Sequence, residues 1–418
     1  MPHVLLVGVS MRAAAASASH AGYDVTVVDA FGDIDLPSTV RVVPFASSPT
    51  AFNAVAFTPA QSSPPFSPVA AARASRGVTC DAVVYGSGFE NHPRAVAALS
   101  RGRVLWGNPP DVLCRVRCPR QFLGAFRREG FRVPDTLEPG AVGELGEPGA
   151  LGEPGAATAV DTASGGWIQK PFRSGGGHGI RIWHPGTAVA RGAYLQARVD
   201  GTPGSVVFVA AGGDAVALGV SRQLVGDPVF GATGFRYCGS ILSRAGDLFG
   251  DDETVVATAS ALARAAARAH GLVGVNGIDF MARDGVPSPI EINPRWSASM
   301  ELVERACGTS VFAAHAAACI DGALPVRALL VPEPPTPGKP VVGKALGKAI
   351  VFARRAVVAG ATRSWLGRDD LSDVPAPGTP IASGAPVCTV FAEGQSAAEC
   401  YAALARRAQA VYSEMRLW

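Results

Sequence analysis

The chain has 418 residues, which excludes a single small binding module and is enough for two to four compact domains. Its net charge of +3 is too small for the dense basic field that marks a nucleic-acid binder or a protein attached to anionic membranes. Hydrophobic residues make up 48% and charged residues 17%, while 49 Gly and 33 Pro indicate a globular protein rich in loops.

The amino-terminal 110 residues predict a parallel sheet. The Ala-rich stretch 12–20 predicts a helix between two apolar runs, which is a β-α-β opening rather than a leader segment, since no early Lys or Arg precedes it. The Pro- and Ser-rich stretch 43–76 is interpreted as an inserted surface loop. The expected strands lie at 3–9, 23–29, 81–85 and 104–106.

Two segments in the middle of the chain have an unusual composition. Residues 101–132 carry eight Arg and two acidic residues at helical spacing, which favours a solvated helical face over a phosphate-binding one. Residues 138–156 repeat Gly-Glu-Pro-Gly and predict an insertion without chemistry. Alternating strands follow to about residue 220.

The last third predicts a helix at 253–270, strands at 274–281 and 289–293, and one long helix at 297–320. Five Pro at 332–340 mark a linker to a small α+β appendage with a final helix at 396–415. The predicted domain divisions are 1–110, 111–135, 136–200, 201–330 and 331–418.

Two further features favour a cytoplasmic protein. The longest uncharged stretch, 42–72, contains six Pro and cannot cross a membrane as a helix. The eight Cys show no CxxC spacing, and a chain of this size has enough core to do without disulfides, so free thiols are expected.

The strongest local signal is the segment Gln169-Lys-Pro-Phe-Arg-Ser-Gly-Gly-Gly-His-Gly-Ile180. Its glycines let backbone N–H groups close around phosphate oxygens, and Lys170 precedes them on a strand, unlike the Lys of a Walker loop. The chain has only four Lys, and Lys170 is the only one before residue 339. A flexible hairpin is the competing interpretation of the loop.

A second signal is Asp279 followed by Glu291-Ile-Asn293-Pro-Arg295. Alternation along a strand places Glu291 and Asn293 on one face, and such oxygen ligands suit Mg²⁺ with bound phosphates. Arg295 can present a forked donor to a phosphate or a developing oxyanion. Surface carboxylates and an ion pair of Arg295 with Glu301 or Glu304 are the competing interpretations.

In these motifs the sequence resembles the ATP-grasp superfamily of carboxylate–amine ligases over residues 1–325. Segments such as 86–91 and 294–301 resemble more narrowly a branch that accompanies tetrahydromethanopterin-dependent one-carbon metabolism. The resemblance implies an α/β fold of the ATP-grasp type. Its expected parts are an N-terminal parallel-sheet (pre-ATP-grasp, Rossmann-like) domain, a split α+β ATP-binding domain and a small C-terminal α+β appendage.

The resemblance also implies roles for individual residues. Lys170 would contact the ATP phosphates and assist catalysis with Arg295, and a glycine loop would close over them. Asp279, Glu291 and Asn293 would hold Mg²⁺, for which Mn²⁺ can substitute. The remaining residues expected to bind ATP are Ser174, Gly175, Gly176, Gly177, Gln196, Arg198 and Val199.

Two departures from the family pattern stand out. Ala197 occupies a hinge position where relatives often carry Glu, and no second ATP-contacting Lys is present near 118–120, which leaves Arg117 or Arg120 as its replacement. The acceptor site is expected at strand ends of the first domain and in the crevice they face. The candidate residues are Ser10, Arg12, Ser87, Glu90, Arg222, Tyr237 and Trp296.

The function expected from the resemblance is ATP-dependent joining of a small-molecule carboxylate to an amine, such as glutamate, through an acyl phosphate, in cofactor biosynthesis for one-carbon metabolism. No nucleic-acid or membrane partner is expected, and homodimers are common in the family. The alternatives are a non-catalytic nucleotide-binding protein and a biotin-carboxylase-like enzyme that acts on bicarbonate.

Overall fold

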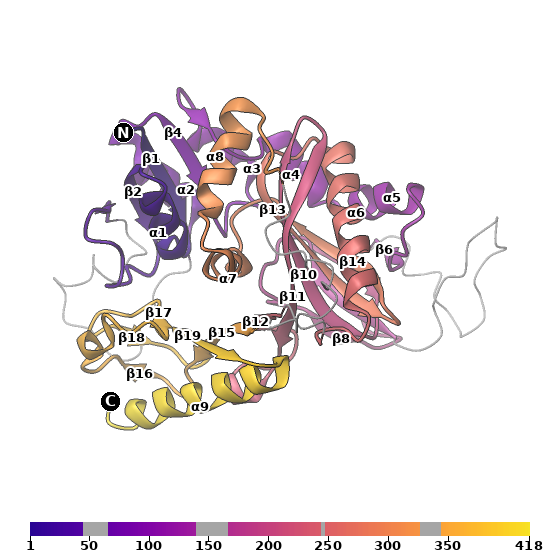
Figure 1. Cartoon of the computed structure of the whole chain (residues 1–418). Coiled ribbons are helices and arrows are strands. Elements are labelled where there is room, and N and C mark those ends of the chain that lie inside the picture. Colours follow the sequence, from indigo (N-terminus) through magenta and orange to yellow (C-terminus); the bar gives the residue numbers. More distant parts are fainter. Residues whose placement is uncertain (45–65, 139–165, 244–246, 327–343) are drawn as a thin grey trace, which may run out of the picture.

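The computed structural model describes residues 1–44, 66–138, 166–243, 247–326 and 344–418. The expected linker at 332–340 and almost all of the expected insertion at 138–156 lie outside these residues. Within them the expected α/β fold class is confirmed, with one parallel sheet and several antiparallel ones. Figure 1 shows the N-terminal sheet and the central sheet side by side, with the C-terminal segment below them.

The N-terminal domain is built on a parallel sheet of five strands in the order β3-β2-β1-β4-β5. Helix α1 (Arg12–His20) packs with β1 and β2 on one face, and helices α2 (Pro68–Ala74) and α3 (Pro93–Leu99) pack on the other. The strands are β1 (His3–Gly8), β2 (Asp24–Asp29), β3 (Arg41–Val42), β4 (Ala82–Tyr85) and β5 (Val104–Leu105).

The interpretation of 43–76 as a surface loop is wrong for its described end. Ser67 caps helix α2 through the backbone N–H of Ala70, and a 3₁₀ turn (Ser75–Gly77) continues it. Ala71 and Ala72 are buried against the N-terminal sheet. Small apolar residues after a Ser cap and a Pro form a helix once a sheet face is available to cover.

Two helices and a small antiparallel sheet follow. Helices α4 (Pro110–Val116) and α5 (Pro119–Arg128) occupy the Arg-rich stretch. The small sheet has the order β6-β9-β7-β8. Its strands are β6 (Thr136–Leu137), β7 (Trp167–Pro171), β8 (Arg181–Trp183) and β9 (Ala193–Ala197).

The central sheet has eight strands in the order β14-β13-β10-β11-β12-β15-β19-β17. Helix α6 (Asp252–His270) and α5 cover one face of β10, β11, β13 and β14. The strands before residue 300 are β10 (Thr202–Ala211), β11 (Asp214–Val225), β12 (Tyr237–Leu242), β13 (Gly274–Arg283) and β14 (Val286–Asn293).

The predicted long helix at 297–320 is in fact two helices, α7 (Ala298–Cys307) and α8 (Val311–Asp321). Gly308 ends α7 in the left-handed conformation with φ 66°, and Ser310 caps α8. Helical spacing continues across the break, so periodicity alone misses it, whereas a Gly followed by a capping Ser is the local signal. Both helices pack between the N-terminal and central sheets (Figure 1).

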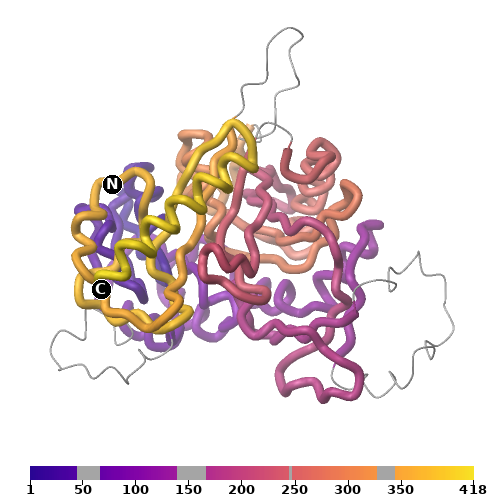
Figure 2. Tube along the Cα trace, turned by 90° about the horizontal axis from the view of Figure 1, so that it is seen from below, coloured from indigo at the N-terminus to yellow at the C-terminus, as the bar shows by residue number. Residues whose placement is uncertain are grey.

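The C-terminal segment has the expected α+β composition but is continuous with the central sheet. Strand β15 (Ala345–Phe352) pairs antiparallel with β12, and β19 (Pro386–Gly394) pairs with both β15 and β17 (Leu371–Ser372). Helix α9 (Ala397–Met415) covers these strands, as Figure 2 shows from below. A two-stranded sheet, β16 (Val357–Val358) with β18 (Pro380–Ile381), completes the segment.

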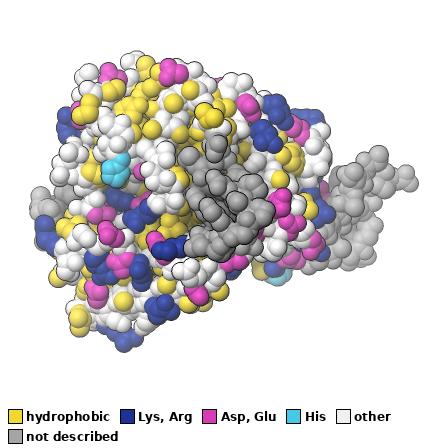
Figure 3. Space-filling model, in the orientation of Figure 1, with side chains coloured by type: hydrophobic (Ala, Val, Ile, Leu, Met, Phe, Trp, Pro, Cys, Tyr) yellow, Lys and Arg dark blue, Asp and Glu magenta, His cyan; other side chains and the backbone are white. Residues whose placement is uncertain are grey.

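The described surface agrees with the weak net charge. Acidic and basic side chains are interspersed over the face seen in Figure 3. Among the described helices, none is long and apolar enough to cross a membrane. All eight Cys are free thiols, as expected from their spacing.

Candidate functional site

The side chain of Lys170 on β7 joins the small sheet to the central sheet. Its Nζ donates to Oε1 of Gln196 on β9 at 3.3 Å and to the carbonyl oxygen of Ile290 on β14 at 3.1 Å. Burial lowers the pKa of the Lys170 ammonium, and the carboxylates of Glu291 and Asp279 oppose this shift. The structure thus holds a compact cation at a defined point between the two sheets.

A small cavity, partly open to solvent, lies beside Lys170. Four polar residues of its wall converge from α4–α5, β7, the glycine loop and β14. The lining residues are Lys170, Arg117, Ser174 and Glu291, with Val116, Pro119, Phe122, Pro171, Phe172, Ile180, Tyr194 and Ile290.

Of the two residues expected to replace the missing second Lys, Arg117, at the end of α4, is the one that lines this cavity. Its Nη1 pairs with Oε1 of Glu291, and its Nη2 donates to the carbonyl oxygen of Ser174 at 2.7 Å. Burial would lower the pKa of Arg117, but the Glu291 carboxylate raises it. Arg120, the other candidate, is exposed on α5 and does not line the cavity.

The glycine loop is docked on both neighbouring domains. The carbonyl oxygen of Ser174 accepts from Nδ2 of Asn91 at 3.0 Å, and the backbone N–H of Tyr237 donates to the carbonyl oxygen of Gly176 at 3.1 Å. Gly177 has φ 80°, and a Cβ there would lie 1.8 Å from the carbonyl oxygen of Phe235. Only glycine fits this approach, so the loop sequence is matched to its docked position.

Asp279 and Glu291 face each other on neighbouring strands. The two residues are paired in the register of β13 and β14, and Nδ2 of Asn293 donates to Oδ2 of Asp279 at 2.9 Å. Burial and the Glu291 carboxylate raise the pKa of Asp279 to about 6. Burial opposes a low pKa for Glu291, but Arg117 and Lys170 lower it. Two close carboxylates with an amide suit a hard divalent cation, which would relieve their repulsion.

Arg295 follows this group and is held by Glu90 of the N-terminal domain. Its Nε and Nη2 donate to Oε1 of Glu90 at 3.0 and 2.7 Å, and its Nη2 also donates to Oδ1 of Asn293 at 3.3 Å. The guanidinium therefore lies within one hydrogen bond of the proposed metal ligands.

A comparison of the sequence with known domain families identifies the family of the segment that contains this cavity. Residues 123–299 match the ATP-grasp domain, and this stretch holds Lys170, the glycine loop and the strand that ends at Asn293. The chain contains an ATP-grasp domain. A comparison with curated proteins found no match.

Solved ATP-grasp structures match along almost the whole chain. The L-amino acid ligase from Bacillus licheniformis is 16% identical with a TM-score of 0.62, and the match covers 97% of both chains. N5-carboxyaminoimidazole ribonucleotide synthetase from Thermus thermophilus is also 16% identical with a TM-score of 0.62, over 97% of this chain and 98% of that one. Biotin carboxylase from Campylobacter jejuni is 13% identical with a TM-score of 0.65, over 96% and 89%. These likenesses extend the ATP-grasp fold to both ends of the described chain.

The predicted hinge residues do not line the cavity, although Gln196 contacts Lys170, which does. Gln196 is buried on β9 and accepts from Lys170. Arg198 and Val199 follow β9 and do not line the cavity, and Arg198 is exposed and pairs with Asp200 at 3.3 Å. The adenine contacts expected from the backbone at these positions stay a prediction.

The structure places the candidate acceptor residues in different surroundings. Ser10 and Ser87 follow the neighbouring strands β1 and β4, and Val9 N–H donates to the Ser87 carbonyl at 3.1 Å. Tyr237 is half-buried, and its hydroxyl is 2.9 Å from Oγ of Ser240. Burial raises its pKa and Asp279 contributes to the shift, which places its ring near the carboxylate pair.

Two other acceptor candidates are less well placed. On β11, Gln223 donates to Oδ1 of Asp279 at 2.9 Å, so Arg222 next to it lies on the opposite face, where its charge acts on Tyr401 of α9. We therefore remove Arg222 from the acceptor site. Trp296 is buried beside Arg295, and its Nε1 has no partner in the described part of the chain.

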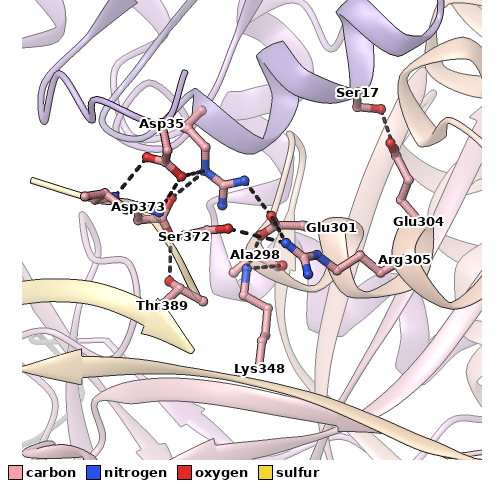
Figure 4. Close-up of polar contacts among 12 residues, drawn as sticks. Ser17, Asp35, Ala298, Glu301, Glu304, Arg305, Lys348, Ser372, Asp373 and Thr389 are labelled. Atoms are coloured by element: carbon pink, nitrogen blue, oxygen red, sulfur yellow. Dashed lines mark hydrogen bonds and ion pairs between the residues drawn. The ribbon is translucent and has the colours of Figure 1, made fainter. Parts of the chain in front are cut away.

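Arg12, the remaining acceptor candidate, is committed to an ion cluster that joins three parts of the molecule (Figure 4). Its Nη1 donates to Oε1 of Glu301 on α7 at 2.6 Å, and its Nε donates to Oδ1 of Asp373 at 2.9 Å. Lys348 on β15 donates to Oε2 of Glu301 at 2.7 Å. Burial opposes a low pKa for Glu301, but Arg12 and Lys348 hold it well below the usual range. We assign Arg12 to this junction rather than to substrate binding.

Sequence reasoning missed Gln223 and Asn91, which contact Asp279 and the glycine loop. Gln223 lies on a strand that contributes no recognised motif, and only the sheet order places it opposite Asp279. Asn91 follows Glu90 within the segment 86–91, which carries the narrower resemblance and was the available signal.

Proposed function

We propose that this protein is an ADP-forming ligase that joins a carboxylate to an amine through an acyl phosphate. The observation that carries the proposal is the cavity lined by Lys170, Arg117 and Glu291, together with Asn293 on the same strand as Glu291, which accepts a hydrogen bond from Arg295. Positioning and charge neutralisation are sufficient for phosphoryl transfer, so no nucleophilic side chain is required.

The cations of the cavity are suited to the triphosphate of ATP. Lys170 is held between the two sheets, and Arg117 lines the same cavity from the end of α4. Backbone N–H groups of the glycine loop, including those of Gly175, Gly176 and Gly177, can close around phosphate oxygens when their present contacts rearrange.

Asp279, Glu291 and Asn293 are the residues that would hold Mg²⁺. A bound divalent ion would neutralise charge on the phosphate oxygens. The donor set fits, because two carboxylates and an amide from the paired strands β13 and β14 are hard oxygen donors close to one another. Glu291 forms an ion pair with Arg117 in this structure. When Mg²⁺ binds, the two side chains must therefore separate, or Glu291 must contact both Arg117 and the metal ion.

Arg295 is suited to the step in which the acceptor attacks the acyl phosphate. Its forked guanidinium can stabilise the oxyanion that develops at the carbonyl carbon. The amine then loses a proton and forms the C–N bond, phosphate leaves with the electrons of the C–O bond, and the released phosphate takes up the proton. Glutamate and pterin-linked acids are the substrates we propose to test first, in line with cofactor assembly for one-carbon metabolism.

The test is ADP release by the purified full-length protein with Mg-ATP, measured across a library of carboxylates and amines. Release that needs both an acid and an amine would support the ligase and name its substrates. Release that needs bicarbonate instead would favour a carboxylating enzyme. ATP binding without release for any pair would favour a non-catalytic protein.

Two Glu→Gln variants serve as controls for this assay. Glu291→Gln removes a proposed metal ligand and should nearly abolish release. Glu129→Gln, at an exposed ion pair with Arg268, should leave release unchanged. Equal activity of Glu291→Gln and wild type would rule out the assigned site.

A further inference from the structure

Glu90 is a buried carboxylate with one oxygen that the ion pair does not use. Both hydrogen bonds from Arg295 go to Oε1, and Oε2 has no hydrogen-bond partner among the described residues. The residue is only 2% exposed. A desolvated carboxylate oxygen without a donor is unfavourable, so its retention at this point indicates a ligand that supplies the donor.

Glu90 lies where three parts of the proposed active site meet. It follows β4 in the N-terminal domain, and a Cβ at Gly175 of the glycine loop would lie 3.6 Å from its Oε1. The next residue, Asn91, donates to the carbonyl of Ser174 in the same loop. Arg295 links Glu90 to Asn293. A group bound to Oε2 would therefore lie close to Arg295 and beneath the glycine loop.

The chemistry of this oxygen selects the charge of its ligand. A carboxylate oxygen accepts hydrogen bonds and attracts cations, and in a buried place it repels anions strongly. The positive charge of Arg295 is directed to Oε1 and Asn293, so it leaves Oε2 as a buried negative edge without a donor among the described residues. A protonated amine supplies both the donor and the charge that this edge lacks.

We propose that Oε2 of Glu90 binds the ammonium group of the acceptor amine. This inference rests on the proposed ligase function and deepens it, because it makes the acceptor a cationic amine rather than bicarbonate or a second anion. Glu90 then has two roles through its two oxygens: Oε1 positions Arg295, and Oε2 positions the acceptor nitrogen.

Glu90→Gln separates these two roles. The amide oxygen can still accept from Arg295, while the NH₂ group replaces the oxygen that would bind the ammonium. Methylamine and hydroxylamine are matched probes, since they are similar in size, but at mildly alkaline pH methylamine is a cation and hydroxylamine is mostly neutral. Both are supplied with Mg-ATP and the acid that gives the most ADP release in the screen above.

Wild type is expected to form both the N-methylamide and the hydroxamate. In Glu90→Gln the ratio of methylamide to hydroxamate should fall about tenfold or more, the scale of one lost charge-assisted hydrogen bond, because methylamide formation falls further than hydroxamate formation. Glu90→Asp keeps the charge and should retain a higher ratio than Glu90→Gln. It also serves as the test variant if Glu90→Gln does not fold.

Other outcomes overturn the proposal. An unchanged ratio, a parallel loss of both products, or a wild type that makes hydroxamate but no methylamide shows that Glu90 does not select a cation. A wild type that forms neither product with any acid contradicts the ligase function itself, and the role of Glu90 falls with it. Hydroxamate formation by wild type thus distinguishes the two failures.

Discussion

Two clusters of the same composition have opposite consequences in this molecule. Arg117, Glu291 and Lys170 meet at the cavity, and Arg12, Glu301 and Lys348 meet at the junction of the N-terminal domain, α7 and β15 (Figure 4). Each places a Glu between an Arg and a Lys from distant segments. Residue types and burial alone therefore do not mark a functional site.

The difference lies in the surroundings of the Glu in each cluster. At the junction both oxygens of Glu301 are paired at 2.6 and 2.7 Å, and Lys348 also donates to the carbonyl of Ala298. At the cavity Glu291 faces a second carboxylate, Asp279, and borders open space. A Glu with both oxygens paired to buried cations stabilises an interface, whereas a Glu that faces a second carboxylate beside a cavity can bind a ligand.

The largest expected effect is on stability at the junction. Glu301→Gln leaves Arg12 and Lys348 buried without their shared counter-charge, so we expect a loss of about 3–5 kcal/mol in the free energy of unfolding. Urea unfolding of both proteins measures it. Unchanged stability would contradict the stabilising role assigned to Glu301 at this junction.

The matched change at the cavity should act on activity instead. Glu291→Gln should lower kcat by about a hundredfold to a thousandfold, as expected when a group that organises phosphate charge is lost. Its stability should fall less than that of Glu301→Gln, because repulsion with Asp279 is relieved. The two variants are compared by ADP release and by urea unfolding. Similar decreases in the free energy of unfolding would contradict the difference proposed between the two clusters.

Arg117→Ala should weaken ATP binding about tenfold, because it removes one charged donor from the cavity. Arg120→Ala is the control, since this side chain is exposed and lies outside the cavity wall. Binding of a fluorescent ATP analogue measures both. If the two variants bind the ATP analogue with equal affinity, the assignment of Arg117 to ATP binding is wrong.

The smallest effect concerns acid stability. Because the pKa of Glu301 is lowered on folding, its contribution to stability is present above the unfolded value of 4.5 and is lost as pH falls towards the folded value. This adds a slope of at most about 1.4 kcal/mol per pH unit below 4.5. The gap in unfolding free energy between wild type and Glu301→Gln should therefore narrow as the solution is acidified, and a gap independent of pH would contradict it.

The sequence determined the features that depend on local spacing. Alternation predicted the strands that carry Lys170 and Glu291, and Ala-rich helical spacing predicted α1 and α9. The glycine loop was recognisable because a close backbone approach, such as that of Gly177 to Phe235, excludes side chains. These properties follow from the backbone and from nearest neighbours along the chain, so they are visible in the residue order.

Only the tertiary structure decided which distant residues meet. It selected Arg117 over Arg120, placed Gln223 opposite Asp279, and committed Arg12 to Glu301, 289 residues away. It also joined Glu90 to Arg295. These contacts depend on the register between strands and on the packing of separate domains, which residue types at a given spacing do not specify. The sequence therefore indicated which types of side chain form the site, and the fold determined which of them contact one another.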